Sequence, residues 1–521
     1  MKKHLCIIAL FLTVTGLTCT AQMFQKTYGS SGNDQAYCVQ QTNDEGFIVA
    51  GQTAGFNPNF YYDVYLIKLS NIGDTLWTKW HRVGTYSLES RYVEQNSDSG
   101  YIVCGKAGNN GLLLRTNAQG NILWSKIIVG FNFITANEVH QTSDGGFIVI
   151  ATVSPLTGPD YILLLKMDAG GNITWQKIFS SGASNYDDGN SVRQTNDGGY
   201  IITGATVNLS VSSGMLLAKT DATGSVLWAK AFGAPGTFNI GWSVRQTADS
   251  GYVIGGQTVT TPGTNYNAYM IKTNSTGDTL WTRAYGGSNP DYARTVQQTG
   301  DGGYMLAGYT QSFGAGGSDG YLLKTDSAGN LSWSKAYGGV SSDLFYFGMQ
   351  ANDGGYIAAG STASFGSGSA DVYLVKTGAS GNSGCNGINA GTVEYVPPCI
   401  PGTVTFAVSS VVTASTLSLT TGSGGTETSL CLTTGIHEME NEELPITIYP
   451  NPFSSETKIA FNGIIQSGEV EIFTIHGKKI YSNKIINATE VNVRVENMTP
   501  GMYFVKLHNG KHLSVRKVII Q

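Results

Sequence analysis

The stretch from Ser243 to Gly286, SVRQTADSGYVIGGQTVTTPGTNYNAYMIKTNSTGDTLWTRAYG, holds the pattern that decides the fold of this 521-residue chain. It reads as four short β-rich runs with no segment of helical periodicity between them: 243–247, 252–258, 268–273 and 279–285. Asp249-Ser250-Gly251 joins the first two runs, and such a turn is typical of a hairpin because glycine tolerates the positive φ of tight turns. We therefore expect one four-stranded antiparallel sheet.

The same unit recurs along the chain. A turn of the form Asp-x-Gly-aromatic begins at seven aspartates that lie 46 to 54 residues apart: Asp44, Asp98, Asp144, Asp197, Asp249, Asp301 and Asp353. A series of six tryptophans follows in step: Trp77, Trp124, Trp175, Trp228, Trp281 and Trp333. Because repeats of this period bury their faces by stacking on one another, the sequence predicts an all-β fold, a seven-bladed β-propeller over residues 22–380 with four-stranded blades.

The seventh tryptophan is missing, and its place is explained by the other end of the domain. Phe24-Gln25-Lys26-Thr27-Tyr28-Gly29 is similar to Trp281-Thr282-Arg283-Ala284-Tyr285-Gly286, the fourth run of a complete repeat. We therefore expect the N-terminal strand to complete the last blade and close the ring, which removes the exposed edges of an open array.

The link before each tryptophan carries a second resemblance. The run from Asp221 through Gly224 to Trp228 is similar to the docking signature of quinoprotein-like (PQQ-like) blades, in which the tryptophan packs between neighbouring blades. The resemblance implies a fold and no chemistry, since the chain has no adjacent cysteine pair. We expect the tryptophans to serve in packing.

Composition sets the class of protein. Charged residues make up 13% of the chain, with 31 basic against 36 acidic, so the sequence lacks the basic footprint of a nucleic-acid-binding protein. Residues 1–21, with Lys2, Lys3 and an apolar run, are typical of a cleaved signal peptide. That run, Leu5 to Val14, is too short for a transmembrane anchor.

Residues 381–441 form a Gly/Ser/Thr-rich region, which we interpret as a linker or small module. In an exported chain Cys385 and Cys399 could form a disulfide, with Cys431 as a competing partner.

Residues 442–521 make a separate unit. Several short runs alternate apolar and polar residues, which predicts a small Ig-like β-sandwich. Tyr449-Pro450-Asn451-Pro452, then the run from Pro500 to Lys506, and the terminal Lys517-Val518-Ile519-Ile520 resemble the type A C-terminal sorting domain of the Bacteroidota type IX secretion system over 444–521. The resemblance implies passage through the periplasm, contact with the secretion machinery, and release or attachment to surface lipopolysaccharide. An ordinary Ig-like binding module is the alternative.

The repeats offer little catalytic material. His81 and His140 are the histidines of the propeller region, too few for a histidine metal cluster, so no metal, cofactor or catalytic residue is assigned. The seven turn aspartates are interpreted as turn formers.

The longer connections suggest a ligand face, because binding residues concentrate on loops and aromatic rings beside Asn and Asp suit sugars. The candidates are Tyr61, Tyr186, Asp188, Asn239, Trp242, Asp291, Tyr292, Arg294 and Tyr346. We therefore expect a secreted or outer-membrane surface protein with a non-catalytic binding or adhesion role toward a glycan or protein. The alternatives are a carbohydrate-active or other propeller enzyme and a structural surface-layer component.

Overall fold

The computed structural model falls into two compact units, residues 1–433 and 434–521. It describes residues 22–56, 61–84, 86–182, 186–208, 211–233, 237–259, 265–385, 387–395, 400–403, 407–409, 412–417, 419–432, 446–449, 451, 456–474, 479–494, 501–508 and 513–520. The expected signal peptide lies outside these residues. The described residues form strands and turns without a helix, and none of them supplies a helix able to cross a membrane.

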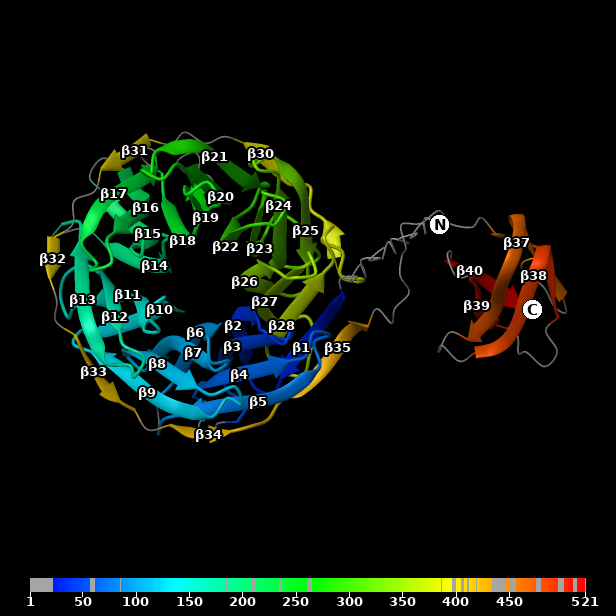
Figure 1. Ribbon diagram of the computed structural model, residues 1–521, viewed down its shortest axis with the longest axis horizontal. Coiled ribbons are helices and arrows are strands. Elements are labelled where there is room, and N and C mark those ends of the chain that lie inside the picture. Colours follow the sequence, from blue (N-terminus) through cyan, green and yellow to red (C-terminus); the bar gives the residue numbers. More distant parts are fainter. Residues whose placement is uncertain are drawn as a thin grey trace, which may run out of the picture. The chain divides into compact units, whose positions relative to one another are not determined.

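The first unit is a ring of seven antiparallel sheets, which confirms the predicted propeller (Figure 1). Blades 1 to 3 are built from β2 (Asp34–Gln41), β3 (Phe47–Thr53), β4 (Asp63–Leu69), β5 (Thr75–Arg82), β6 (Leu88–Gln95), β7 (Tyr101–Ala107), β8 (Asn110–Thr116), β9 (Ile122–Val129), β10 (Phe133–Gln141), β11 (Phe147–Ser154), β12 (Tyr161–Met167) and β13 (Ile173–Ser180). Blades 4 to 6 follow with β14 (Asp187–Gln194), β15 (Tyr200–Asn208), β16 (Val211–Thr220), β17 (Val226–Gly233), β18 (Asn239–Gln246), β19 (Tyr252–Val259), β20 (Tyr266–Thr273), β21 (Thr279–Gly286), β22 (Asp291–Gln298), β23 (Tyr304–Thr310), β24 (Asp319–Thr325) and β25 (Leu331–Tyr337).

Blade 7 joins the two ends of the propeller chain. It contains β26 (Asp343–Gln350), β27 (Tyr356–Thr362), β28 (Asp371–Thr377) and, as its fourth strand, β1 (Phe24–Gly29). β1 pairs antiparallel with β28 from Phe24 opposite Lys376 to Tyr28 opposite Val372. The N-terminal strand therefore closes the ring, as expected.

Neighbouring blades are joined by aromatic pairs. The six repeat tryptophans each meet the aromatic residue after the next blade's turn, with ring centroids 5.4 to 6.0 Å apart, as Trp175 does with Tyr200. Gly224 lies against Trp175 at a φ of 77°, and a Cβ there would come within 2.7 Å of the indole. Positive φ and close approach together explain why glycine occupies this link.

Each turn aspartate is paired with a buried cation from the third strand of its blade. The pairs are Lys68–Asp44, Arg115–Asp98, Lys166–Asp144, Lys219–Asp197, Lys272–Asp249, Lys324–Asp301 and Lys376–Asp353. These carboxylates lie in hairpins and hold the blades' own strands together. They therefore do not form a carboxylate site.

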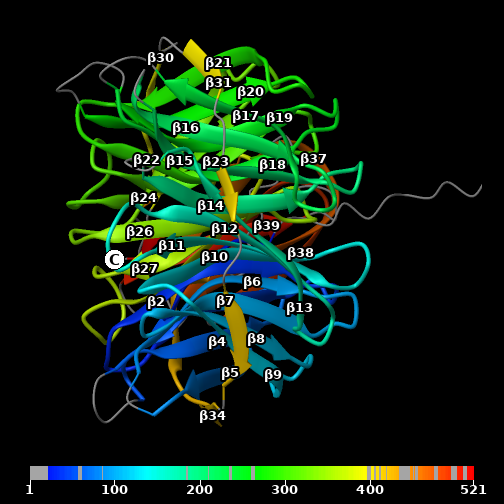
Figure 2. The same cartoon turned by 90° about the vertical axis from the view of Figure 1, so that its left-hand side faces the viewer.

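The region expected as a linker surrounds the propeller. Seven short strands, which we call the belt, each add a fifth strand to one blade: β29 (Gly387–Asn389), β30 (Val393–Tyr395), β31 (Ile400–Thr403), β32 (Ala407–Ser409), β33 (Thr413–Thr416), β34 (Thr420–Gly422) and β35 (Thr426–Leu432). They pair in turn with β25, β21, β17, β13, β9, β5 and β1, so the chain passes every blade in reverse order. The yellow and orange belt strands cross the outer blade edges in side view (Figure 2). The belt thus covers edges that would otherwise be open to pairing.

The second unit is an antiparallel β domain. It comprises β36 (Ile446–Tyr449), β37 (Glu456–Thr474), β38 (Lys479–Arg494), β39 (Gly501–His508) and β40 (Leu513–Ile520). The 19-residue β37 pairs with β38 on one side and with β36 and β39 on the other. Alternate residues of β37 such as Val470 and Ile472 are fully buried. The apolar positions of the alternating sequence pattern therefore form the core of this domain.

Candidate ligand site in the central channel

The first strand of every blade lines the centre of the ring and contains a break in its pairing with the second strand. In β18, for example, Gly241 lies opposite Gly256 and Ser243 opposite Gly255, so Trp242 is an extra residue. The equivalent extra residues, which we call the bulge ring, are Tyr37, Arg91, Asn137, Asn190, Trp242, Arg294 and Tyr346. A bulge of this kind re-aims a side chain.

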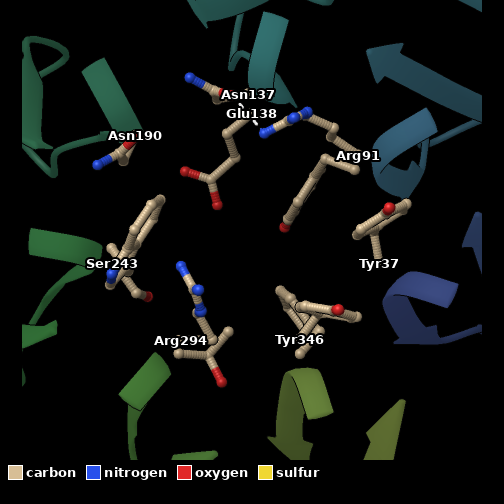
Figure 3. Close-up of a pocket in the computed structure, with 12 residues that line it drawn as sticks. Tyr37, Arg91, Asn137, Glu138, Asn190, Ser243, Arg294 and Tyr346 are labelled. Carbon is tan, nitrogen blue, oxygen red and sulfur yellow. Dashed lines mark hydrogen bonds between the residues drawn. The ribbon is translucent and has the colours of Figure 1, made fainter. Parts of the chain in front are cut away.

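All seven members of the bulge ring line one cavity (Figure 3). Tyr92, Glu138, Ser243, Thr295 and Phe347, which directly follow bulge residues, complete its lining. The cavity is therefore built from seven strands at one shared structural position.

The bulge ring varies between blades, whereas the last residue of each first strand does not. The last residue of these seven strands is always glutamine, as in Gln41 and Gln95, and its side-chain oxygen accepts a hydrogen bond from the neighbouring blade's turn. Gln41 of blade 1 accepts from the Asn352 amide of blade 7 at 2.8 Å, so the same contact is made where the ring closes. Positions that hold the ring together thus repeat, whereas the bulge position is Tyr, Arg, Asn or Trp according to the blade.

Arg294 is held in place by aromatic rings. Its guanidinium lies 4.2 Å from the centre of the Trp242 ring and 5.5 Å from that of Tyr309, and its Nη2 donates to the Tyr309 hydroxyl at 3.1 Å. Its buried Nε has no hydrogen-bond partner among the described residues. Stacking therefore fixes the arginine while leaving a donor unused.

Two further contacts shape the wall. Tyr37 and Tyr346 lie side by side with ring centroids 5.1 Å apart. Arg91 donates from Nη1 to the Asn137 side-chain oxygen at 3.3 Å, and the Oγ of Ser243 is buried without a partner among the described residues. The wall thus offers aromatic surface next to polar groups.

The deeper part of the channel contains a buried ionic network. Glu138 lies 2.8 Å from Arg193, 3.2 Å from His140 and 3.9 Å from Arg245, and it accepts from the Val192 amide at 2.8 Å. Burial opposes ionisation, but the charge of Arg193 holds the pKa of Glu138 below its usual value. Burial, and then repulsion by Arg193, lower the pKa of Arg245 to about 10. At neutral pH this network therefore presents ionised Glu138 to the cavity, whose wall it helps to form.

The structure separates the residues expected on a ligand face. Trp242, Arg294 and Tyr346 belong to the bulge ring, and Tyr292 stacks beside them on Tyr309 at 4.6 Å. Burial, and then repulsion by Asp160, raise the pKa of Asp188 on β14 to about 6.

The other expected residues lie apart from the cavity lining. Asn239 and Asp291 are 1% and 0% exposed, because each bonds a buried threonine of the second strand and so fixes the start of the first. Tyr61 and Tyr186 are 40% and 57% exposed.

The residues of the cavity lining that were not expected from the sequence include Tyr37, Arg91, Asn137, Asn190 and Glu138. A signal for the first four was present: each lies four residues before the invariant glutamine, at the repeat position that holds Trp242, Arg294 and Tyr346 in the other blades.

Two remaining expectations concern metals and cysteines. The described residues contain no group of three or more His, Cys, Asp or Glu side chains that could hold a metal ion. Cys38 and Cys104 are buried free thiols, and Cys385 is disulfide-bonded. Cys399 lies outside the described residues.

Comparisons with solved structures find propeller neighbours at low identity. Drosophila Plexin A in complex with Semaphorin 1b is 10% identical, with a TM-score of 0.37, covering 69% of this chain and 88% of that one. A puromycin hydrolase mutant is 10% identical, with a TM-score of 0.32 and coverages of 64% and 59%. The extracellular domain of a hybrid two-component system from B. thetaiotaomicron is 11% identical, with a TM-score of 0.19 and coverages of 93% and 67%.

No curated protein matches the sequence significantly. A family model does match the second unit. Residues 447–521 match the secretion system C-terminal sorting domain, which implies interaction with the type IX secretion machinery and export to the cell surface or the medium.

Proposed function

We propose that this chain is a non-catalytic binding protein, displayed on the cell surface or released, whose ligand is held by the bulge ring. The observation that carries the proposal is that seven bulges bring aromatic, cationic and amide side chains to one cavity, while the glutamine four residues after each bulge is the same in every blade. Bulges cost regular pairing and occur next to functional sites. A ring built only for stability would not need varied residues at that position.

The cavity favours binding over glycoside hydrolysis. Such enzymes ordinarily use two carboxyl groups, one acting as an acid and one as a base or nucleophile. Among the described residues that line the cavity, Glu138 is the one carboxylate, and it is already engaged by Arg193 and the Val192 amide. Its pKa is held low, which is unfavourable for a general acid.

The binding test compares aromatic residues inside and outside the cavity. Purified 22–521 is screened on a glycan array and against surface proteins, with Trp242→Ala and Tyr346→Ala as site variants and exposed Tyr186→Ala as control. We expect the site variants to lose at least tenfold in affinity, since each removes a stacking surface, while the control is unchanged. Equal binding by all three variants would contradict the proposal.

The export step is tested separately, because it depends on the second unit. We further propose attachment to surface lipopolysaccharide after passage through the periplasm, as the type A resemblance implies. A chain ending at Thr433 should remain in the periplasm, whereas the full chain reaches the surface or the medium. Normal surface display of the truncated chain would refute this role of residues 434–521.

A further inference from the structure

We propose, building on the ligand site above, that the bulge ring binds a sugar bearing a carboxylate, with Arg294 pairing with that acid group. The first step is the charge of the channel. Its two cavities are lined by four arginines, Arg91, Arg193, Arg245 and Arg294, and by two glutamates, Glu94 and Glu138, so the formal charge is +4 − 2 = +2. An anion entering this channel is therefore attracted.

The second step is that the four channel arginines differ in whether a carboxylate lies beside them. Among the described residues, three channel arginines lie within 4.0 Å of a carboxylate: Arg91 at 2.9 Å from Glu89, and Arg193 and Arg245 near Glu138. Arg294 has no such partner among them. It is the channel cation left for a ligand.

The third step is geometry. Trp242 and Tyr309 stack on the Arg294 guanidinium and fix its plane, while its Nε donor is buried and unused. Figure 3 shows the guanidinium directed into the cavity, facing Glu138 from the opposite side. A planar guanidinium presents parallel N–H groups that match the two oxygens of a carboxylate. The group is thus prearranged for an acid, and little side-chain freedom is lost on binding.

The rest of the lining suits the sugar that carries the acid. The Nδ2 groups of Asn137 and Asn190 donate to the carbonyl oxygens of Gly189 and Gly241, so the side-chain oxygens are the atoms that can accept hydrogen bonds from ligand hydroxyls. Ionised Glu138 accepts hydrogen bonds from hydroxyls as well. The pair Tyr37 and Tyr346 offers a ring face on which the CH surface of a pyranose can stack. A small carboxylate without hydroxyls would leave these groups unused.

The experiment measures affinities of the full chain 22–521 by calorimetry. The probes are tetramers of galacturonate and of glucuronate, their carboxyl-reduced neutral counterparts, and a 6-sulfated galactose tetramer. We expect one uronate tetramer to bind at least tenfold more tightly than its reduced counterpart, with affinity falling as salt is raised from 0.05 to 0.5 M.

Matched variants then test the arginine. Arg294→Gln should lower uronate affinity by about 10- to 100-fold, the effect of one charge-assisted hydrogen-bonded pair, and should lower the affinity for the neutral sugar by less than this. Arg294→Lys keeps the positive charge but lacks the parallel N–H donors of the guanidinium. Its uronate affinity should therefore lie between that of Arg294→Gln and that of the unsubstituted chain. The control is Arg283→Gln, because Arg283 also lies over a tryptophan, Trp281, but on the outer strand β21, where it pairs with Glu394. Unchanged thermal unfolding of each variant shows that it is folded.

Each other outcome has a defined meaning. Equal affinity for uronate and reduced tetramers, or tighter binding of the sulfated one, would overturn the carboxylate assignment while leaving the bulge ring as a ligand site. Failure of every probe to bind would also overturn it, and the proposed function would then be judged by the Trp242 and Tyr346 variants with other ligands. Uronate binding that Arg294→Gln and Arg283→Gln reduce equally would show that Arg294 is not the acid's partner.

Discussion

The aromatic ring of Phe24 lies edge-on to that of Phe47, with centroids 6.4 Å apart. Elsewhere in the propeller this contact is made by a tryptophan and the aromatic residue of the next blade, as by Trp77 and Tyr101 at 6.0 Å. Phe24 thus takes the place of the missing seventh tryptophan at the junction between blade 7 and blade 1. The two ends of the propeller chain are held by the same kind of contact as its interior.

Replacing Phe24 with alanine should weaken the whole ring. Phe24 is 1% exposed, and truncating a buried phenylalanine costs about 3 to 5 kcal/mol of unfolding free energy. We expect urea unfolding of Phe24→Ala to remain a single transition at a lower midpoint, because opening one junction exposes the edges of two blades. Phe133→Ala is the control, since Phe133 is 46% exposed. An unchanged midpoint for Phe24→Ala would show that closure does not depend on this contact.

Acid should unfold the propeller through its turn aspartates. A hydrogen bond from Thr142, acting against burial and supported by Lys166, lowers the pKa of Asp144 to about 2, and Asp197, Asp249 and Asp301 have the same value. Since an unfolded aspartate has a pKa of about 3.9, these groups stabilise the fold fully above about pH 4 and lose that contribution as pH falls toward 2.

Urea midpoints at pH 6, 4, 3 and 2 measure this effect. Asp144→Asn should be less stable than the natural chain at pH 6 and should lose less on acidification. Glu45→Gln, a change at an exposed turn residue, is the control. If Asp144→Asn shows the same pH dependence as the natural chain, Asp144 does not contribute to acid unfolding.

A disulfide should connect the chain at the two ends of the belt. The Cys385 sulfur lies 3.8 Å from the carbonyl oxygen of Leu430, and Gln25 of β1 both bonds Cys385 and pairs with Cys431. We therefore predict a Cys385–Cys431 disulfide, in preference to Cys385–Cys399, and about 2 to 5 kcal/mol of stabilisation from it. Peptide mapping under non-reducing conditions identifies the pair. A linked Cys385–Cys399 peptide would contradict this assignment.

Removing one partner from the buried ionic network around Glu138 should lower the free energy of unfolding. In Glu138→Gln, Arg193 loses its buried partner, so we expect a loss of about 3 to 5 kcal/mol in unfolding free energy. Glu89→Gln removes the less buried partner of Arg91 and should cost less than about 1 kcal/mol. Similar losses for both variants, measured by urea unfolding at pH 7, would contradict a special role for the buried network.

Local sequence determined the ring and its closure. The Asp-x-Gly-aromatic turns recur in all seven blades and the tryptophans in six, and the similarity between the segments at Phe24 and Trp281 marks the fourth strand of the seventh. The alternation of apolar and polar residues likewise marked the strands of the second unit. Such features are readable because backbone turns and β pleating depend on neighbouring residues.

Only the tertiary structure decided which residues share the channel and what residues 387–432 do. Arg91 and Arg294 lie 203 positions apart in the sequence and meet one cavity because seven first strands surround one axis, each with a bulge that the repeat alone does not reveal. The belt strands have little apolar pattern, since their pairing uses backbone hydrogen bonds that any residue except proline can donate. The sequence therefore determined the scaffold, and the convergence of distant strands decided the site.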